Sequence, residues 1–169
     1  MAYQATTRSL PQCAVIDLKG PAADIEPRLQ ALGLPAAVVG RAVRGGAVEL
    51  IKAGREHWLL LAPLKQEDRL LHALQVKTLA ADSLVLGMSD LYHFFAIEGT
   101  DARQLVAVAS PLDADPVAFP DDGATFTEAF GLKALLLRRP NGFALAIERS
   151  HAPMLAEYFS RINPGDGRG

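Results

Sequence analysis

The sequence predicts an α+β fold made of two pseudo-symmetric halves, each a mostly antiparallel sheet with covering helices. The main observation is an internal repeat, because residues 40–74 and 125–159 align without a gap. Leu18-Lys19-Gly20 also matches Ile97-Glu98-Gly99, with an offset that gives the second copy about six extra residues in a loop. Each copy has the pattern strand, helix, three strands, helix. The strongest matched positions are Gly46 with Gly131, Leu50 with Leu135, Trp58 with Phe143, Leu60 with Leu145 and Leu70 with Leu155.

The length of 169 residues fits one domain with a substantial core. We predict a single domain over residues 13–162, composed of two repeats at about 13–76 and 83–162. Residues 1–12 and 163–169 are polar or Gly-rich, and we expect flexible termini there.

The first repeat begins with an apolar strand at 13–18. Ile25, Leu29 and Leu32 then recur at helical spacing, and Gly33 is placed to end this helix. The remaining predicted elements are strands at 38–43, 47–53 and 57–62 and a helix at 65–74.

The second repeat follows a predicted bridging strand at 83–88 and begins with a strand at 92–97. We expect Thr100 to cap a helix over 101–109 and Ser150 to cap a final helix that runs to about residue 162. Between them we predict an antiparallel meander with a tight turn at Asn141-Gly142 that needs positive backbone torsions. Its strands are predicted at 125–130, 133–138 and 143–148.

Composition narrows the classes of partner. Half of the residues are hydrophobic, 21% are charged and the mean hydropathy is +0.14, which favours a surface that meets another protein. The longest apolar runs have about seven residues, far fewer than a membrane-spanning helix needs. The net charge is −2 with scattered Lys and Arg, so nucleic acid is not an expected partner. A single cysteine and the lack of a recognisable secretory signal indicate the cytoplasm.

No group of polar residues has a recognisable catalytic or ligand-binding pattern. We therefore predict no catalytic residue and no metal site. Cys13 opens an apolar strand, which favours core packing over a reactive thiol. Ser89, Asp90 and His93 resemble a hydrolase set, but the Gly-x-Ser-x-Gly elbow is missing.

The other candidates are equally weak as sites. The loop acids Asp113, Asp115, Asp121 and Asp122 lack the spacing of a calcium loop, and the four histidines, His57, His72, His93 and His151, are too dispersed for a zinc pattern. Gly45-Gly46 is not followed by the lysine of a phosphate loop, and no dinucleotide fingerprint is present. Trp58 and Phe143 are interpreted as core, and Arg41, Arg44 and Arg55 as solvated.

Several runs of both repeats have a recognisable pattern. In the second repeat and just before it these are Met88-Ser89-Asp90-Leu91-Tyr92, Ile97-Glu98-Gly99-Thr100-Asp101-Ala102-Arg103, Ser110-Pro111-Leu112-Asp113 and Pro116-x-Ala118-Phe119-Pro120, and in the first repeat Gly40-Arg41-Ala42 and Glu56-His57-Trp58-Leu59-Leu60. Together these runs resemble the gamma subunit of heterotetrameric sarcosine oxidase. The resemblance covers most of residues 15–159, and Ala109 stands where family members often have cysteine.

The resemblance implies a fold related to the folate-binding aminomethyltransferases, such as the T-protein of glycine cleavage. It also implies a non-catalytic structural subunit that joins alpha, beta and delta subunits. The resemblance further implies that in such a complex FAD, FMN, NAD and tetrahydrofolate serve the demethylation of sarcosine to glycine, and we expect none of them to be bound by this chain.

Two other functions stay open. The same ancestry allows a free-standing folate-binding or aminomethyltransferase-like protein, for which Asp90 and Asp101 are the weak candidates to hold the pterin ring. Asp101 is more simply a first-turn helix acid. The third possibility, a hydrolase, rests only on His93 and Cys13.

Overall fold

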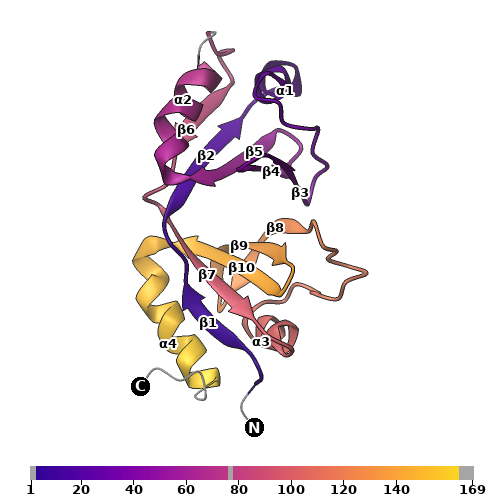
Figure 1. Ribbon diagram of the computed structural model, residues 1–169, viewed down its shortest axis with the longest axis vertical. Helices are drawn as coiled ribbons and strands as arrows, with labels where there is room; N and C mark the ends of the chain where they lie inside the picture. The colour runs from indigo at the N-terminus through magenta and orange to yellow at the C-terminus, as the bar shows by residue number, and fades with distance from the viewer. Residues whose placement is uncertain (1–2, 76–77, 164–169) are drawn as a thin grey trace. The chain divides into compact units, whose positions relative to one another are not determined.

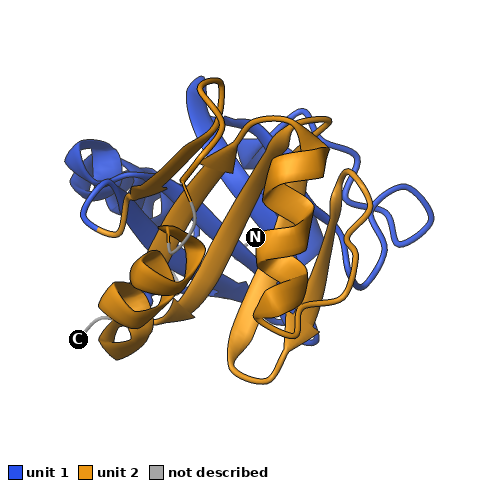
Figure 2. Cartoon of the chain, turned by 90° about the horizontal axis from the view of Figure 1, so that it is seen from above, with its two compact units in different colours: residues 1–11, 90–169 blue, residues 12–89 orange. Residues whose placement is uncertain are grey.

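A computed structural model describes residues 3–75 and 78–163 of the chain. The described residues form two five-stranded antiparallel sheets and four α-helices, which confirms the predicted α+β class (Figure 1). The chain divides into two compact units (Figure 2): unit 2 is Gln12–Ser89, and unit 1 combines Met1–Pro11 with Asp90–Gly169. No helix of the described residues is long and apolar enough to cross a membrane.

Unit 2 is a sheet in the order β3-β4-β5-β2-β6 with its helices on one face. Alternate residues of β2 and β5, such as Ile16 and Trp58, pack against Ile25 and Leu29 of α1 and Leu70 of α2. The elements are β2 (Cys13–Lys19), α1 (Ala22–Ala31), β3 (Arg41–Gly45), β4 (Val48–Gly54), β5 (His57–Pro63), a 3-10 turn η1 (Leu64–Gln66), α2 (Glu67–Gln75) and β6 (Leu84–Gly87).

Unit 1 repeats this architecture with a sheet in the order β1-β7-β10-β9-β8. Its core joins Ile97 of β7 and Phe143 of β10 to Leu105 of α3 and to Leu155 and Phe159 of α4. The elements are β1 (Thr6–Ser9), β7 (Tyr92–Glu98), α3 (Ala102–Ala109), β8 (Ala124–Ala129), β9 (Leu132–Arg139), β10 (Gly142–Glu148), a 3-10 turn η2 (Arg149–His151) and α4 (Ala152–Ile162).

The edge strands cross between the repeats. β1 immediately precedes β2 in the chain but pairs with β7, whereas β6 precedes β7 and pairs with β2. β1 therefore leads into the first repeat but completes the sheet of the second. β6 leads into the second repeat but completes the sheet of the first. The predicted boundaries need correction on this point, because Leu84–Gly87 belong to the first sheet and Thr6–Ser9 to the second.

Two equivalent glycines allow this exchange. Gly20 follows β2 with φ 139°, and Gly99 follows β7 with φ 122°. A Cβ atom on Gly20 would lie 2.9 Å from the Cα of Ser83, and one on Gly99 would lie 2.9 Å from the Cα of Ala5. Lys19-Gly20 and Glu98-Gly99 thus mark the two places where the chain passes close to the sheet before it enters β6 and β1.

The gapless sequence alignment is wrong by one residue between β4 and β9 and by three residues between β3 and β8, because Val43 pairs with Leu50 whereas Thr125 pairs with Leu136. Leu50 of β4 lies in the helix-side core, but Leu135 of β9 does not, and its neighbour Leu136 takes that place. A bulge between Lys52 and Gly54 absorbs the extra residue, so that β5 and β10 are again in step.

The predicted caps and one turn also need correction. Asp101 and His151, rather than Thr100 and Ser150, precede the first residues of α3 and α4. Gly142 has φ 148°, but Asn141 does not have the positive torsion that we expected, and Gly142 is already the first residue of β10.

The termini are more ordered than predicted within the described residues. Thr6–Ser9 is a strand, and the buried side chain of Asn163 donates a hydrogen bond to the carbonyl of Ala5 at 2.6 Å. Backbone polar groups, which every sequence carries, hold this segment, so its composition gave no signal. Residues 164–169 of the predicted flexible terminus lie outside the described residues.

Candidate functional sites

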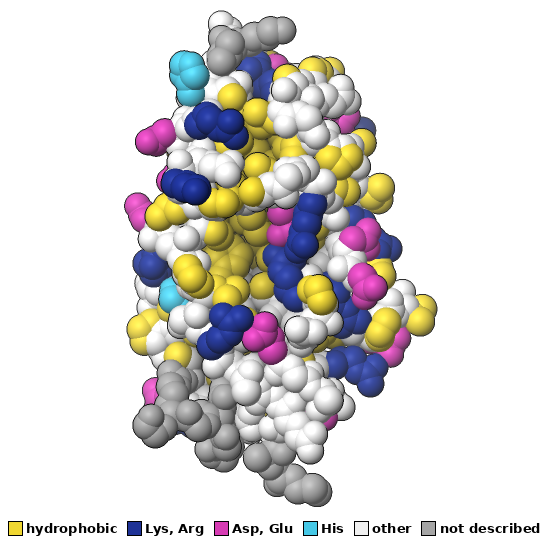
Figure 3. Space-filling model, viewed as in Figure 1, with side chains coloured by type: hydrophobic (Ala, Val, Ile, Leu, Met, Phe, Trp, Pro, Cys, Tyr) yellow, Lys and Arg dark blue, Asp and Glu magenta, His cyan; other side chains and the backbone are white. Residues whose placement is uncertain are grey.

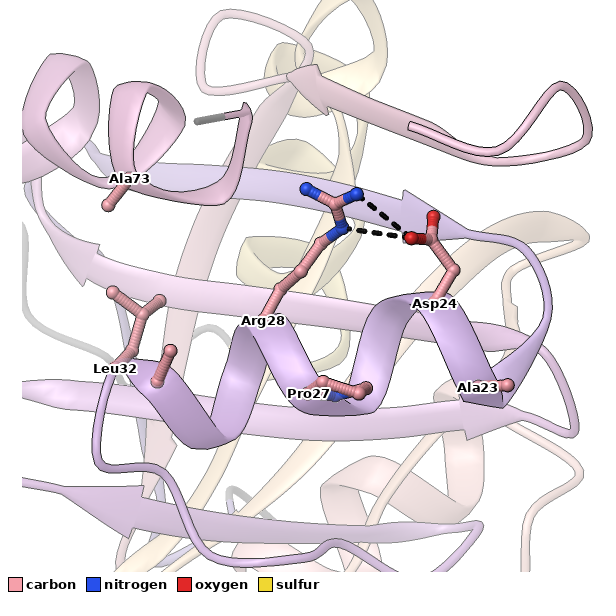
Figure 4. A pocket seen from close by; sticks show the side chains of 7 residues that line it. Ala23, Asp24, Pro27, Arg28, Leu32 and Ala73 are labelled. Atoms are coloured by element: carbon pink, nitrogen blue, oxygen red, sulfur yellow. Dashed lines mark hydrogen bonds and ion pairs between the residues drawn. The ribbon is translucent and has the colours of Figure 1, made fainter. Parts of the chain in front are cut away.

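An open pocket of about 430 Å³ lies between α1 and α2 in unit 2 (Figure 4). This volume is in the range of small-molecule pockets, roughly 300–1,000 Å³. Sequence reasoning missed the pocket, because its walls are ordinary helix residues with no functional pattern. The lining residues are Ala23, Asp24, Pro27, Arg28, Ala31, Leu32 and Ala73.

The two charged residues of the pocket are bonded within the protein. The guanidinium of Arg28 donates to Oδ1 of Asp24 at 2.8 Å and to the carbonyls of Leu74 at 2.9 Å and Thr78 at 3.0 Å. The Arg28 side chain is only 8% exposed. These bonds tie α1 to the end of α2, so the arginine supports the helix pair and the rest of the wall favours an apolar group over an anion.

The two folate candidates lie at opposite ends of β7. Asp90 precedes the strand and is exposed, and its carbonyl accepts a hydrogen bond from Arg149 at 2.9 Å. Asp101 follows the strand, and its Oδ2 accepts the backbone N–H of Gln4 at 2.8 Å. A strand of this length separates them by roughly 20 Å. They do not converge on one ligand, and neither lines the pocket.

Two residues of the hydrolase set bond to other side chains. Ser89 is buried, donates to Glu67 at 2.5 Å and accepts the N–H of Val15 at 2.9 Å. His93 instead contacts the hydroxyl of Ser9 at 3.1 Å. Burial and the nearby charge of Arg149 hold the pKa of His93 below its usual value. Each of these two side chains therefore has a hydrogen-bond partner outside the set suggested by the sequence.

The loop acids fold their own loop. Oδ1 of Asp113 accepts the N–H of Asp115 at 2.9 Å, and Asp115 pairs with Arg103 at 2.7 Å. Within residues 3–75 and 78–163 no group of three or more His, Cys, Asp and Glu side chains could hold a metal ion.

One buried polar cluster was not singled out from the sequence. Asp17, in the apolar run of β2, contacts Nε2 of His57 at 2.5 Å and Nζ of Lys19 at 3.2 Å. Burial alone would raise the pKa of Asp17, but the hydrogen bond and charge of His57, together with Lys19, outweigh it and lower the pKa. The signal available was a lone acid inside an apolar strand, which demands a partner. Its partners were not readable from the sequence.

The remaining candidates occupy structural positions. Trp58 and Phe143 are both buried in the cores, as predicted. Cys13 is half-buried at the start of β2. Arg44 pairs with Glu49 at 3.5 Å and Arg55 is exposed. On the face shown in Figure 3, Lys and Arg side chains lie among Asp and Glu side chains.

The two repeated units define an α+β fold that is also present in sarcosine oxidase and in aminomethyltransferase T. A chain of the heterotetrameric sarcosine oxidase from Corynebacterium sp. U-96 superposes with a TM-score of 0.85 and 19% identity, over 98% of this chain and 86% of that one. The glycine cleavage system aminomethyltransferase T from Bartonella henselae superposes with a TM-score of 0.70 and 17% identity.

The aminomethyltransferase match covers 94% of this chain but only 46% of the enzyme. At these identities the likenesses establish the fold. A scan against protein-family models and a search of curated proteins found no match.

Proposed function

We propose that this chain is a non-catalytic structural subunit, the gamma subunit, of a heterotetrameric sarcosine oxidase complex. The observation that carries the proposal is the likeness to a chain of such an oxidase, which extends over 98% of this protein and 86% of the matched chain. The proposed complex demethylates sarcosine oxidatively to glycine and passes the one-carbon unit to tetrahydrofolate.

The most specific run of the family resemblance supports a structural role. Ser110 shares a hydrogen bond with the hydroxyl of Thr127 at 3.0 Å and accepts the N–H of Leu112 at 3.3 Å. Asp113 bonds within the same loop. These polar groups hold the loop between α3 and β8 against β8, so their chemistry is used in folding.

The surface offers apolar side chains for subunit contacts. Val38 is 70% exposed, Val39 is 52% exposed and Val117 is 93% exposed. All three lie in loops rather than in strands or helices. In the proposed complex the alpha, beta and delta subunits are the partners, and FAD, FMN, NAD and tetrahydrofolate reside on them.

Co-expression tests this proposal. The tagged chain, expressed with candidate alpha, beta and delta chains encoded beside its gene, is expected to co-purify with them as one species with a flavin spectrum and sarcosine oxidation. The chain purified alone is expected to show neither property. A tagged chain that fails to retain the other subunits, while those subunits assemble into an active oxidase without it, contradicts the proposal.

The alternative is a free-standing folate-binding or aminomethyltransferase-like protein, favoured by the match to aminomethyltransferase T over 94% of this chain. Calorimetry with tetrahydrofolate separates the two functions. Micromolar binding by the isolated chain that is lost in Asp90→Asn or Asp101→Asn supports the alternative. Unchanged heats of dilution support the structural subunit.

A further inference from the structure

The connection between β1 and β2 is short for two strands that belong to different sheets. The N–H of Leu10 still donates to the carbonyl of Phe94 at 2.8 Å, at the end of the β1–β7 ladder. Cys13 already begins β2. Only Pro11 and Gln12 therefore connect the last bonded residue of unit 1 to the sheet of unit 2. Short connections of this kind favour exchange of a strand between copies.

The site that holds β1 recognises backbone atoms. We call it the β1 slot and define it as the edge of β7 together with Asp101 and Asn163. Asn163 is 1% exposed, and its side-chain amide donates to the carbonyl of Ala5 at 2.6 Å and accepts the N–H of Tyr3 at 3.1 Å. Asp101 accepts the N–H of Gln4 at 2.8 Å and donates its own N–H to the Gln4 carbonyl at 3.2 Å. Vacating the slot would leave a buried amide without these bonds.

The side-chain contacts of this segment come mainly from the residues before β1, because Ala5 belongs to the core of unit 1 and Tyr3 packs against that core. Thr6, Arg8 and Ser9 are exposed, and the ion pair of Arg8 with Glu98 is open to solvent. The equivalent edge strand β6 is different, because Val85 packs in the core of unit 2 at the position that Thr7 takes in β1. β1 is thus a strand held mainly through its backbone and linked to the rest of the chain by two residues.

We propose that the β1 slot also binds β1 of a second copy of this chain, giving a strand-exchanged dimer. The incoming strand has the sequence that the slot already holds, so all the backbone hydrogen bonds re-form between chains. The intramolecular strand competes at an effective concentration on the order of millimolar, which makes the exchange a function of protein concentration. This inference concerns self-association and is independent of the proposed function.

A disulfide across the ladder reports which chain fills the slot. Thr6 lies opposite Glu98, and antiparallel partners have Cα atoms about 4.5–5.5 Å apart, within the reach of a disulfide. The variant carries Thr6→Cys and Glu98→Cys, with Cys13→Ala to remove the only native thiol. Chains labelled with ¹⁴N and ¹⁵N are mixed, unfolded, refolded and oxidised. Mass spectrometry of the linked peptides then counts mixed-isotope 6–98 disulfides.

Refolding at about 1 mM instead of about 10 μM is expected to raise the ratio of interchain to intrachain 6–98 disulfides about a hundredfold, by mass action. The matched control is Lys19→Cys with Leu84→Cys, which occupies the equivalent register between β2 and β6. Both of these strands lie within the continuous unit 2, so this disulfide is expected to stay within one chain at both concentrations.

The control also guards against random oxidation, because non-specific linkage would produce mixed-isotope peptides from both pairs. Three results would overturn the proposal. One is a 6–98 disulfide that stays intrachain at 1 mM, as in the control. Another is equal interchain linkage in both pairs. The third is a pair of thiols that remain free at both concentrations, which would show β1 outside the slot.

Discussion

Asp17 shows how a single buried charge depends on its neighbours. Its side chain is 7% exposed in the middle of a strand, where an isolated carboxylate would be strongly unfavourable. His57 and Lys19 supply the opposite charge, and the pKa of Asp17 falls although burial opposes this. Because the folded-state pKa lies below the ordinary value of 3.8, the cluster stabilises the protein above pH 3.8. This stabilisation is lost as the pH falls through the folded-state pKa.

Replacing Asp17 by Asn is therefore expected to lower the free energy of unfolding at pH 7 by about 1–3 kcal/mol. The difference from the wild type should shrink as the pH falls from 3.8 through the folded-state pKa, because the wild-type carboxylate then also becomes neutral. Urea unfolding between pH 3 and 7 measures this. The control is Glu98→Gln, which removes an exposed ion pair with Arg8 and should change stability by less than about 0.5 kcal/mol. A loss for Asp17→Asn that is equal at pH 3 and pH 7 would refute the assignment.

Phe130 was predicted as the last residue of a strand but lies just after β8. It has φ 49°, a left-handed conformation that costs a non-glycine residue about 1–2 kcal/mol. Its ring lies 5.0 Å from that of Tyr158 and 5.9 Å from that of Phe159, so aromatic packing on α4 offsets the cost. The sequence predicted a strand over residues 125–130, but β8 ends at Ala129, and the contacts with α4 stabilise Phe130 in its left-handed conformation after the strand.

At the level of elements, periodicity predicted most helices and strands, but not how the strands pair. Gly33, with φ 75°, ends α1 as expected, and β5 begins at His57 as predicted. The pairing of β1 with β7 joins residues that lie far apart in the chain, and four polar residues show no alternation that would reveal it. The one-residue slip of β4 was hidden for a related reason. The residue equivalent to Leu50 is Leu136, and Leu135 and Leu137 lie on either side of it in β9. The alignment therefore matched Leu50 with a leucine in either register.

The crossing of β1 and β6 between the repeats predicts that Gly20 and Gly99 do not tolerate a side chain. In Gly20→Ala and Gly99→Ala the new Cβ would lie 2.9 Å from the Cα of Ser83 or Ala5, in addition to the unfavourable φ. Each change is expected to cost about 1–3 kcal/mol beyond the backbone strain. Gly33→Ala is the control, since its φ is 75° but a Cβ would meet nothing within 4 Å. Chemical denaturation measures all three variants, and equal losses would show that the exchanged strands are not tightly approached.

At the scale of the whole molecule, the crossing of β1 and β6 leaves one unit as a single chain segment and the other as two segments. Unit 2 is one continuous segment, Gln12–Ser89, which contains all five strands of its sheet and both of its helices. Unit 1 is assembled from two segments, because β1 comes from the other end of the chain. Without β1, the edge of β7 is unpaired and the buried amide of Asn163 loses its bonds to Tyr3 and Ala5. Similar folds can thus differ in whether a fragment contains everything needed to form them.

The fragment 12–89 is accordingly expected to fold by itself, with a cooperative thermal transition in circular dichroism and dispersed amide resonances. The fragment 90–169 is expected to lack both, because a missing edge strand costs a row of backbone hydrogen bonds as well as the Asn163 contacts. Joining residues 1–11 through a flexible linker after residue 169 of the second fragment supplies β1 and should restore the transition. Dilute samples are required, because the face of β2 and β5 turned away from the helices is apolar at Val15, Leu59 and Leu61. If the second fragment folds equally well without β1, the strand does not contribute to the stability of the sheet.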